Sequence, residues 1–303
     1  MEISIIIPVY NKEQYVKSCL TSALSQDFND YEVIAVDDGS TDGSGIICDE
    51  VASKDSRLRV IHTENGGVTA ARRRGVEEAK GKYIIFSDAD DEYLDGAFSV
   101  MYEAIEKSGA DEVICTYRTQ EGRIGDSGLR GWQPAKPLII DLLSTHDSFC
   151  ALWGIIFRRK ILEGCLDMSR DIIIREDVLM QIKILMKDPK VYFIEDQVYL
   201  YNVDIPNERR VLLNNVKTHD EELKHTLLPK WDIFADYYLL NRVKWYESFI
   251  FERQFYVLDE YYKDLKEEDL SHLPIADRIA FFLPPKVAFF PIWIRKKIKW
   301  RVV

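Results

Sequence analysis

The stretch Tyr83-Ile84-Ile85-Phe86-Ser87-Asp88-Ala89-Asp90-Asp91 decides the fold of this chain. Its first four residues are an apolar run and predict a short, buried strand. The aspartates then lie at the carboxyl end of that strand, where open α/β sheets bind their ligands. The spacing of Asp88 and Asp90 suits Mg²⁺ or Mn²⁺, because such ions bridge one or two carboxylates to substrate phosphates. The alternative is a plain turn in which Asp91 caps the segment that begins near Tyr93.

Four other runs rich in β-branched and apolar residues accompany this one and alternate with helical patterns. The predicted strands cover residues 3–9, 31–36, 58–62, 83–86 and 112–116. Between them apolar residues recur at helical offsets, as they do from Val16 to Leu24. Strands that alternate with helices indicate βαβ units with right-handed crossovers. We therefore expect the α/β class, with a Rossmann-like, mostly parallel sheet flanked by helices.

Beyond Tyr117 this alternation ends. Residues 118–137 contain four glycines and few apolar anchors, which predicts a loop or an irregular hairpin. A helix is predicted at Ile161–Leu166 and two short strands at 191–194 and 198–201, and an aromatic-rich helical stretch runs from Trp231 to Tyr262. We expect residues 1–205 to form one domain, divided near residue 117, and residues 206–303 to form a mainly helical C-terminal extension.

Composition and charge limit the kinds of partner and the cellular compartment that this protein can have. The 303 residues carry 40 Lys and Arg against 51 Asp and Glu, a net charge of −11, which argues against nucleic acid as a partner. No run is long enough to span a bilayer, and the first residues lack the basic segment of a signal peptide. Five scattered cysteines without a C-x-x-C pair indicate reduced thiols, so we expect a cytoplasmic protein.

Residues 278–303 differ from the rest because they hold seven Lys and Arg and no acidic residue. Aromatic and aliphatic side chains are interspersed with these cations, a mixture that can lie on an anionic membrane surface. The alternative is a terminal helix pair that packs on the protein with its lysines in solvent. We expect peripheral contact with the inner face of the cell membrane.

Several common enzyme classes are excluded by what the motifs lack. The first βα junction is Pro8-Val9-Tyr10-Asn11, whereas a dinucleotide-binding turn needs glycines beside the pyrophosphate. There is no H-E-x-x-H, no G-x-S-x-G and no P-loop spacing. NAD enzymes, metalloproteases, serine hydrolases and P-loop NTPases are therefore excluded.

The remaining candidates converge on one crevice at the strand ends. Asp38 follows the second strand and can accept hydrogen bonds from a pyrimidine base, and Pro8, Val9 and Tyr10 can form the wall of that pocket. Arg72 can reach a phosphate or a base edge, as a planar guanidinium suits. The alternatives are that Asp38 only caps a turn and that Arg72 only pairs with a nearby glutamate.

Four segments, in this order and spacing, resemble glycosyltransferase family 2. They are Ser4–Asn11 (SIIIPVYN), Val36–Asp42 (VDDGSTD), Asn65-Gly66-Gly67 with Ala71-Arg72, and Ser87–Asp91 (SDADD). Two later segments are similar to that family's W-x-x-L-[FY]-[RK]-[RK] and G-E-D-x-x-L motifs: Trp153–Arg159 (WGIIFRR) and Ile174–Leu179 (IREDVL). The chain departs from the family at Arg175, where glycine is usual, and at Arg73, where asparagine is common. The resemblance fades after about Asn202.

The resemblance implies a GT-A fold and inverting transfer of one sugar. Residues 1–117 would bind the donor, a nucleoside diphosphate sugar with uridine as the expected nucleoside, and residues 118–205 would form the acceptor side. The acceptor would be a hydroxyl of a growing surface polysaccharide, such as a capsule or lipopolysaccharide, or of a lipid-linked glycan.

The resemblance also implies a role for each candidate residue. Asp177 would be the base that deprotonates the acceptor hydroxyl, and Asp38 would contact uracil. Asp90 would hold Mn²⁺ or Mg²⁺, with Asp88 at the metal, the ribose or a metal-bound water. On the acceptor side would lie Trp153, Glu176 and Asp91.

Two other functions stay open. A non-catalytic nucleotide-sugar-binding scaffold would be favoured by loss of Asp90 or Asp177, yet both are present. A sugar-1-phosphate nucleotidyltransferase would need a glycine-rich basic loop after the first strand, and Pro8–Asn11 is not such a loop. The transferred sugar, the linkage and the oligomeric state have no readable signal in the sequence.

Overall fold

The computed structural model describes residues 1–144, 149–203, 213–255, 258 and 262–299, and only the backbone of residues 279–280 and 295–299. The chain forms two compact units. The first consists of Met1–Ile139 and Asp147–Glu208, and the second of Ile140–His146 and Arg209–Val303. The predicted division of the first part near residue 117 stays a prediction.

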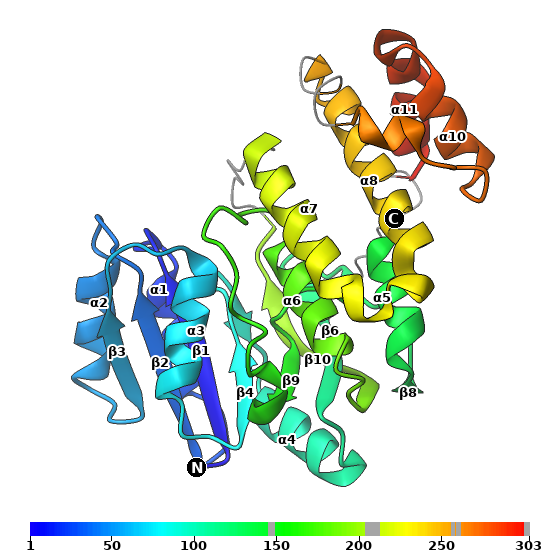
Figure 1. The fold of residues 1–303 in the computed structure, drawn as a ribbon. Coiled ribbons are helices and arrows are strands. Elements are labelled where there is room, and N and C mark those ends of the chain that lie inside the picture. The colour runs from blue at the N-terminus through cyan, green and yellow to red at the C-terminus, as the bar shows by residue number, and fades with distance from the viewer. Residues whose placement is uncertain (145–148, 204–212, 256–257, 259–261, 300–303) are drawn as a thin grey trace. The chain divides into compact units, whose positions relative to one another are not determined.

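The first half of the sheet in the first unit is parallel, with helices on both of its faces (Figure 1). Its strands lie in the order β3-β2-β1-β4, with bounds Leu58–His62, Tyr31–Asp37, Ile3–Val9 and Tyr83–Phe86. Ile3 of β1 lies opposite Tyr31 of β2 and Tyr83 of β4. β1, β2 and β4 are almost wholly buried, and strands covered on both faces are near-continuous apolar runs, which is why the sequence predicted them; β3 lies at the edge and is mostly half-buried.

Helices cover both faces of this half of the sheet. On one face the buried side chains of α1 (Val16–Leu24) and α4 (Ala97–Ser108) share a core with the odd-numbered residues of β1. On the other face α3 (Val68–Glu78) packs closely on β1, because a Cβ at Gly75 would lie 2.3 Å from Cγ2 of Ile6. The α2 helix (Ser44–Ala52) connects β2 to β3. The predicted α/β class and the helices on both faces of the sheet are confirmed.

The second half of the sheet is mixed. β9 (Ile155–Arg158) runs antiparallel between β4 and β6 (Glu112–Thr119), and β10 (Val191–Tyr201) runs parallel to β6. Shorter strands complete it: β5 (Glu92–Tyr93) and β8 (Gly131–Gln133) pair with β10, and β7 (Ile124–Gly125) pairs with β6.

Three details of this half differ from the sequence prediction. β9 was not predicted, because the periodicity of a short apolar run does not distinguish a buried strand from a buried helical segment. The two short strands expected at 191–201 form one strand, β10, with register shifts in the middle. The helical pattern at Ile161–Leu166 gives only a 3₁₀ turn, η1 (Arg159–Leu162), and α6 (Glu176–Leu185) follows it.

The second unit is helical, as the sequence predicted. Its elements are α7 (Leu213–Leu227), η2 (Leu228–Lys230), α8 (Trp231–Phe251), η4 (Asp264–Glu267), α10 (Ile275–Phe282) and α11 (Pro285–Lys299). α5 (Ala135–Leu143) begins in the first unit and ends in the second. The ammonium of Lys244 on α8 donates to Asp277 on α10 at 2.6 Å, and Phe281 packs edge-on against Tyr246. Within the described residues, no helix is both long and apolar enough to cross a membrane.

Candidate functional site

The end of β1 is joined to the loop that follows β2. The carbonyl of Val9 accepts a hydrogen bond from the amide of Asp38 at 2.8 Å, and Asn11 Oδ1 accepts one from the amide of Thr41 at 2.8 Å. Tyr10 between them is 47 % exposed. Pro8, Val9 and Tyr10 therefore lie beside the Asp38 loop at the carboxyl edge of the sheet, where we predicted the wall of a base pocket.

Asp38 is buried and holds the loop that leads into α3. Its Oδ1 accepts from the amide of Gly66 and its Oδ2 from the amide of Gly67, both at 2.8 Å. Gly67 has φ 89°, a conformation that favours glycine, which explains the residue type in this loop. Asp38 is more than a turn cap, because it joins two strand ends; its predicted contact with a base stays a prediction.

Arg72 on α3 reaches the carboxylate that follows β4. It is 6 % exposed, and its Nη2 donates to Asp88 Oδ1 at 3.1 Å. Burial raises the pKa of Asp88 above its ordinary value, and the Arg72 cation opposes that rise. The Nε of Arg72 is also buried and has no hydrogen-bond partner among the described residues. The partner of Arg72 is thus not one of the glutamates nearby but Asp88, and the guanidinium keeps a donor for an oxygen ligand.

Asp90 faces a cation that the sequence analysis did not single out. The ammonium of Lys12, just before α1, donates to Asp90 Oδ2. The two side chains are 29 % and 18 % exposed, so the ion pair is only partly shielded from bulk water. No motif marked Lys12; only its position next to the Pro8–Asn11 junction could have suggested it.

Asp91 is turned away from solvent. It is 2 % exposed, and its Oδ1 accepts from the amide of Asn202 at 2.8 Å. Burial raises the pKa of Asp91 to about 8, and the charges of Asp88 and Asp90 add to that rise. It caps no helix, because α4 begins at Ala97 after Gly96, so the capping alternative is wrong.

The predicted base lies in the first turn of α6. Burial and the charge of Glu176 raise the pKa of Asp177 to about 6, and the amide of Val178 and the Arg72 cation oppose the rise. Glu176 is itself 6 % exposed. The Arg72 cation thus opposes the rise in pKa of both Asp88 and Asp177.

Arg175 occupies the position where the sequence departed from the resembling motif. Its φ is 55°, the left-handed conformation that glycine adopts without strain. This left-handed conformation explains why glycine is usual at this position of the G-E-D-x-x-L motif. Arg175 adopts the same conformation although it carries a side chain. Arg73, the other departure, lies 3.4 Å from Asp167 in an exposed ion pair.

Trp153 is fixed within an aromatic cluster. It stacks on Tyr199 at 4.8 Å and on Tyr201 at 5.2 Å between ring centroids, and Tyr117 meets it edge-on at 4.6 Å. The hydroxyl of Tyr199 also accepts from the amide of Asp88 at 3.0 Å. Through this bond the cluster contacts the loop Ser87–Asp91. The predicted acceptor role of Trp153 stays a prediction.

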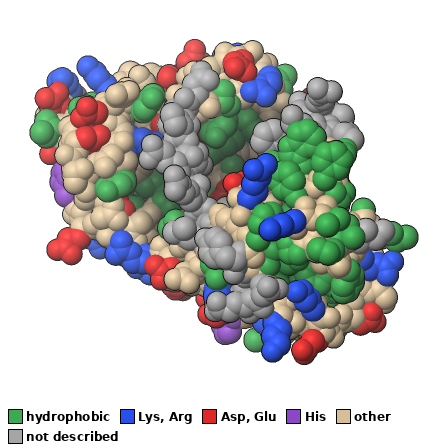
Figure 2. All heavy atoms as spheres, turned by 90° about the horizontal axis from the view of Figure 1, so that it is seen from above, with side chains coloured by type: hydrophobic (Ala, Val, Ile, Leu, Met, Phe, Trp, Pro, Cys, Tyr) green, Lys and Arg blue, Asp and Glu red, His purple; other side chains and the backbone are tan. Residues whose placement is uncertain are grey.

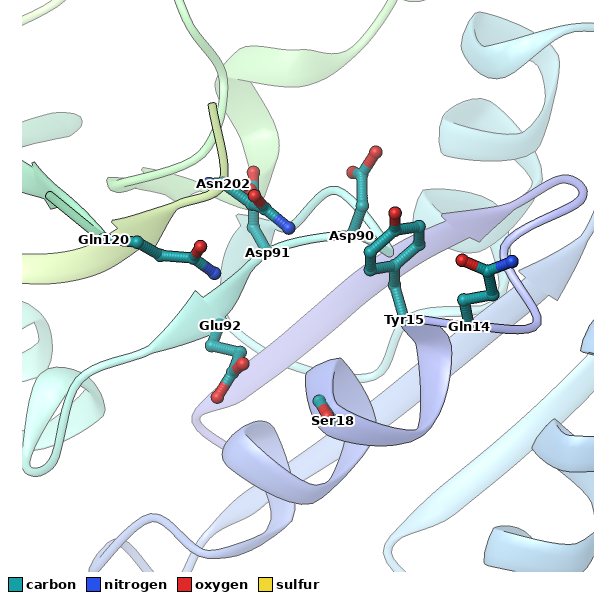
Figure 3. A pocket seen from close by; sticks show the side chains of 8 residues that line it. All are labelled: Gln14, Tyr15, Ser18, Asp90, Asp91, Glu92, Gln120 and Asn202. Carbon is teal, nitrogen blue, oxygen red and sulfur yellow. Dashed lines mark hydrogen bonds between the residues drawn. The ribbon is translucent and has the colours of Figure 1, made fainter. Parts of the chain in front are cut away.

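A pocket of about 330 Å³ opens beside Asp90 and Asp91 (Figure 3). Gln14 and Tyr15 enter it from the segment before α1, and Gln120 and Asn202 line it from the ends of β6 and β10. Sequence reasoning missed these residues, because single glutamine, asparagine and tyrosine residues at loop positions carry no pattern.

The carboxylates at the end of β4 are the candidate ligands of a divalent cation. Within the part of the chain that the structure describes, no three His, Cys, Asp or Glu side chains are arranged to hold a metal. Asp88 and Asp90 offer carboxylate oxygens at the end of β4, the donor type that Mg²⁺ and Mn²⁺ prefer. They fit an ion that completes its shell with substrate oxygens, provided that the Lys12 ammonium leaves Asp90.

Comparison with known proteins gives a consistent result. The profile of the family described as Glycosyl transferase family 2 matches residues 4–166. The chain is 32 % identical over 66 % of its length to the uncharacterized glycosyltransferase EpsJ of Bacillus subtilis, and 30 % identical over 67 % to the glycosyltransferase GlyA of Streptococcus pneumoniae. It spans 60 % of EpsJ and 30 % of GlyA.

Among solved structures, TarS of S. aureus in complex with UDP-GlcNAc matches 89 % of this chain and 89 % of its own with a TM-score of 0.61. The sequence identity of that pair is 19 %, so the likeness concerns the fold. The predicted GT-A fold is confirmed.

Proposed function

Because the chain belongs to glycosyl transferase family 2, we propose that it transfers one sugar from a UDP-sugar to a hydroxyl group, with inversion at the anomeric carbon. The observation that carries this proposal is the position of the buried Arg72 beside the carboxylate of Asp88, which follows β4. Its guanidinium donates to Asp88 and keeps a buried, unpartnered Nε, as a site for a diphosphate oxygen requires. The complexes of TarS with UDP and UDP-GlcNAc support uridine as the nucleoside.

The donor would lie along the carboxyl edge of the parallel strands. Pro8, Val9 and Tyr10 would contact the base and ribose, with Asp38 holding the adjoining loop in place. Arg72 would bind the diphosphate. The conclusion rests on the meeting of the β1, β2 and β4 ends, which is where ligands bind in open α/β sheets.

Asp88 and Asp90 would hold the divalent cation, Mn²⁺ or Mg²⁺. When bound, that ion supplies Lewis-acid stabilisation of the departing diphosphate. Asp90 must exchange its Lys12 ion pair for the ion, whereas Asp88 keeps Arg72 as a neighbour. The chain thereby balances the carboxylates with two cationic side chains before any substrate arrives.

Asp177 would accept the proton of the acceptor hydroxyl. A pKa of about 6 leaves its carboxylate mainly ionised at neutral pH while keeping it a stronger base than an ordinary aspartate. Glu176, buried beside it, would hold the start of α6, and Trp153 and Asp91 would lie on the acceptor side. The expected acceptor is a growing surface polysaccharide or a lipid-linked glycan.

The C-terminal helices would touch the inner face of the membrane. Val287, Phe290 and Ile294 are exposed and share one face of α11, because they are spaced by three and four residues. The opposite face is buried, with Ala288 and Ile292 each at most 1 % exposed. Figure 2 shows apolar and cationic side chains gathered over this part of the molecule. One face therefore packs within the second unit, and the other is available to a lipid surface.

The experiment that tests the reaction compares the protein with its Asp177→Asn variant, using a panel of UDP-sugars. We expect the wild type to release UDP and not pyrophosphate, and the variant to bind UDP normally but turn over at least ~100-fold more slowly. Equal turnover of the two proteins would remove Asp177 from the chemistry. Release of pyrophosphate would indicate a nucleotidyltransferase, and UDP binding without any turnover would indicate a scaffold.

A further inference from the structure

One fully buried carboxyl of the sheet has no part in the proposed reaction. Glu112 begins β6, which lies between β9 and β10, and its exposed fraction is 0 %. Its neighbours in register are Phe157 and Val191, which are both apolar and buried. An ionised carboxylate in such surroundings is costly unless a cation or hydrogen-bond donors compensate for the lost water. Glu112 therefore needs a partner or a proton.

The partner of Glu112 is an amide on the helix that carries the proposed base. Gln181 of α6 is 0 % exposed, and its Nε2 donates to Oε1 of Glu112. α6 lies over β6 in Figure 1, in agreement with this bond. Gln181 comes four residues after Asp177, so the two side chains share one face of the helix. The bond therefore attaches α6 to the sheet about one helical turn from Asp177.

Each member of this pair has a second oxygen that lacks a partner. Oε2 of Glu112 and Oε1 of Gln181 are both buried, and neither forms a hydrogen bond within the part of the chain that the structure describes. Two acceptor oxygens cannot satisfy each other, and a buried acceptor without a donor is costly. A protonated carboxyl has one O–H donor, so a single proton on Glu112 is enough to satisfy both oxygens.

The charged groups near this pair do not replace that proton. The ionisable side chains of α6 and of the segments beside Glu112 are Asp111, Arg158, Glu176, Asp177, Lys183, Lys190 and Tyr192. Arg158 donates to Asp111 at 3.2 Å, and Lys183 donates to the carbonyl of Asp167 at 2.9 Å. Within the described ranges none of them forms an ion pair with Glu112. Burial raises the pKa of Glu112 to about 7, and the hydrogen bond from Gln181 opposes that rise.

We propose that Glu112 is protonated in the folded protein and that its Oε2 donates to Oε1 of Gln181, which gives a neutral acid–amide pair with two parallel hydrogen bonds. The proton comes from solvent as the chain folds, and no other group changes its charge. The pair is a positioning element, because it anchors α6 on β6 and thereby fixes the turn that carries Asp177. Its link to catalysis rests on the proposed function, whereas the protonation of Glu112 does not.

The pair makes the stability of the fold depend on pH. In the unfolded chain Glu112 ionises at its ordinary pKa of about 4.5, whereas the folded protein keeps the proton to about pH 7. The stabilisation is therefore complete below about pH 4.5 and is lost as the pH rises through about 7, because the unfolded chain releases the proton first. Glutamine at this position offers an N–H donor in place of the acid and keeps both hydrogen bonds without a group that titrates.

The test compares the full chain with its Glu112→Gln variant. Carbon-13 NMR of protein labelled at the δ carbon of glutamate reports the protonation of the glutamates and does not detect the aspartates. We expect one glutamate carboxyl that is still neutral at about pH 6, and we expect its signal to be missing from Glu112→Gln. The control is Glu50→Gln, which removes an exposed glutamate of α2 and should leave that signal in place.

Urea denaturation of the same proteins measures the consequence for stability. Between about pH 5 and pH 8 the folding equilibrium constant of Glu112→Gln, relative to that of the wild type, should rise at least about tenfold. The ratio for Glu50→Gln should change by less than about twofold, because an exposed glutamate ionises alike in the folded and unfolded chain.

The positioning role is tested with Gln181→Met, which keeps the length of the side chain and removes both hydrogen bonds. We expect kcat to fall at least about tenfold while the KM for the UDP-sugar stays within about twofold, because α6 carries Asp177 and none of the proposed donor contacts. Glu112→Gln should keep the kcat of the wild type. If Gln181→Met does not fold, the NMR and urea measurements on Glu112→Gln still decide the protonation.

The proposal is overturned if every glutamate is ionised at about pH 6, or if the neutral signal survives in Glu112→Gln. An unchanged ratio of folding constants between the two pH values would also overturn it, and a normal kcat in folded Gln181→Met would remove the positioning role. The NMR and urea measurements need no turnover. A wild type that transfers no sugar would therefore contradict the proposed function and leave the acid–amide pair standing.

Discussion

Replacement of Lys12 by methionine should strengthen the binding of Mn²⁺ to the protein without nucleotide. In the structure the Lys12 ammonium is paired with Asp90 Oδ2, the carboxylate proposed to bind the divalent ion. The cation must displace that ammonium before it can bind Asp90. Methionine keeps the length and apolar stem of lysine and removes only the competing charge.

The magnitude follows from the exposure of the pair. Fully exposed ion pairs contribute about 0–1 kcal/mol, and removal of one partner from a buried pair costs about 3–5 kcal/mol. Lys12 and Asp90 are 29 % and 18 % exposed, which places the pair between these limits and toward the weaker one. We expect a gain of about 1–2 kcal/mol in Mn²⁺ binding, which is about 5- to 30-fold in Kd.

Electron paramagnetic resonance counts free Mn²⁺ directly and reports this change without any turnover. The matched control is Lys17→Met, because Lys17 is an exposed lysine of α1 without an ion pair among the described residues. It removes one unit of positive charge at a similar place in the chain. Unchanged or weaker Mn²⁺ binding by Lys12→Met, relative to Lys17→Met, would refute the competition between Lys12 and the metal.

Three further predictions concern the base, the packing of α3 and the C-terminal helices. Turnover should rise with pH through about pH 6 and then level off, because Asp177 accepts a proton only when ionised and its pKa is raised to about 6; a pH profile of kcat measures this. Gly75→Ala should lower the free energy of unfolding by about 1–3 kcal/mol in urea denaturation, because its Cβ would lie 2.3 Å from Cγ2 of Ile6. Val287→Ser with Phe290→Ser should reduce sedimentation with anionic vesicles at least about tenfold, because both side chains are more than half exposed.

Each of these predictions has a control or a result that would contradict it. A kcat that stays constant from pH 5 to pH 8 would exclude Asp177 as the base, because this range extends at least about one pH unit to either side of its pKa. Ile6→Ala should make Gly75→Ala less costly than it is alone, and strict additivity would show that the two residues do not clash. Ile46→Ser removes an equally exposed apolar side chain from α2 and should leave vesicle binding unchanged. If the paired tail variant also sediments like the wild type, the membrane contact is wrong.

The strands of the parallel half could be predicted because burial on both faces imposes a continuous apolar run. Ile3–Val9 and Tyr31–Asp37 are buried along almost their whole length, so composition alone marks them. β9 escaped prediction because its neighbours β4 and β6 are far away in the chain, and their pairing is a long-range property. Antiparallel insertion of a four-residue strand leaves no local periodicity by which it could be recognised.

The residues of the candidate site were likewise only partly predictable from the sequence. Asp88, Asp90 and Asp177 were predicted from motifs with fixed spacing, and the structure places the first two after the end of β4 and the third in the first turn of α6. Lys12 and Gln120 were missed, since what matters for them is the distance to Asp90 or to the pocket. That distance is set by the loop conformations, which no pattern of residue types encodes.

The measurement that tests the central claim most directly is calorimetric titration of UDP into the protein, with and without Mn²⁺, repeated on Asp90→Ala. The account predicts UDP binding that Mn²⁺ strengthens in the wild type, and a loss of that metal-dependent gain in the variant. The loss should be at least about tenfold, because Asp90 is one of the two carboxylates that offer oxygens to the ion. No binding of UDP by the wild type under either condition would contradict the proposed donor site.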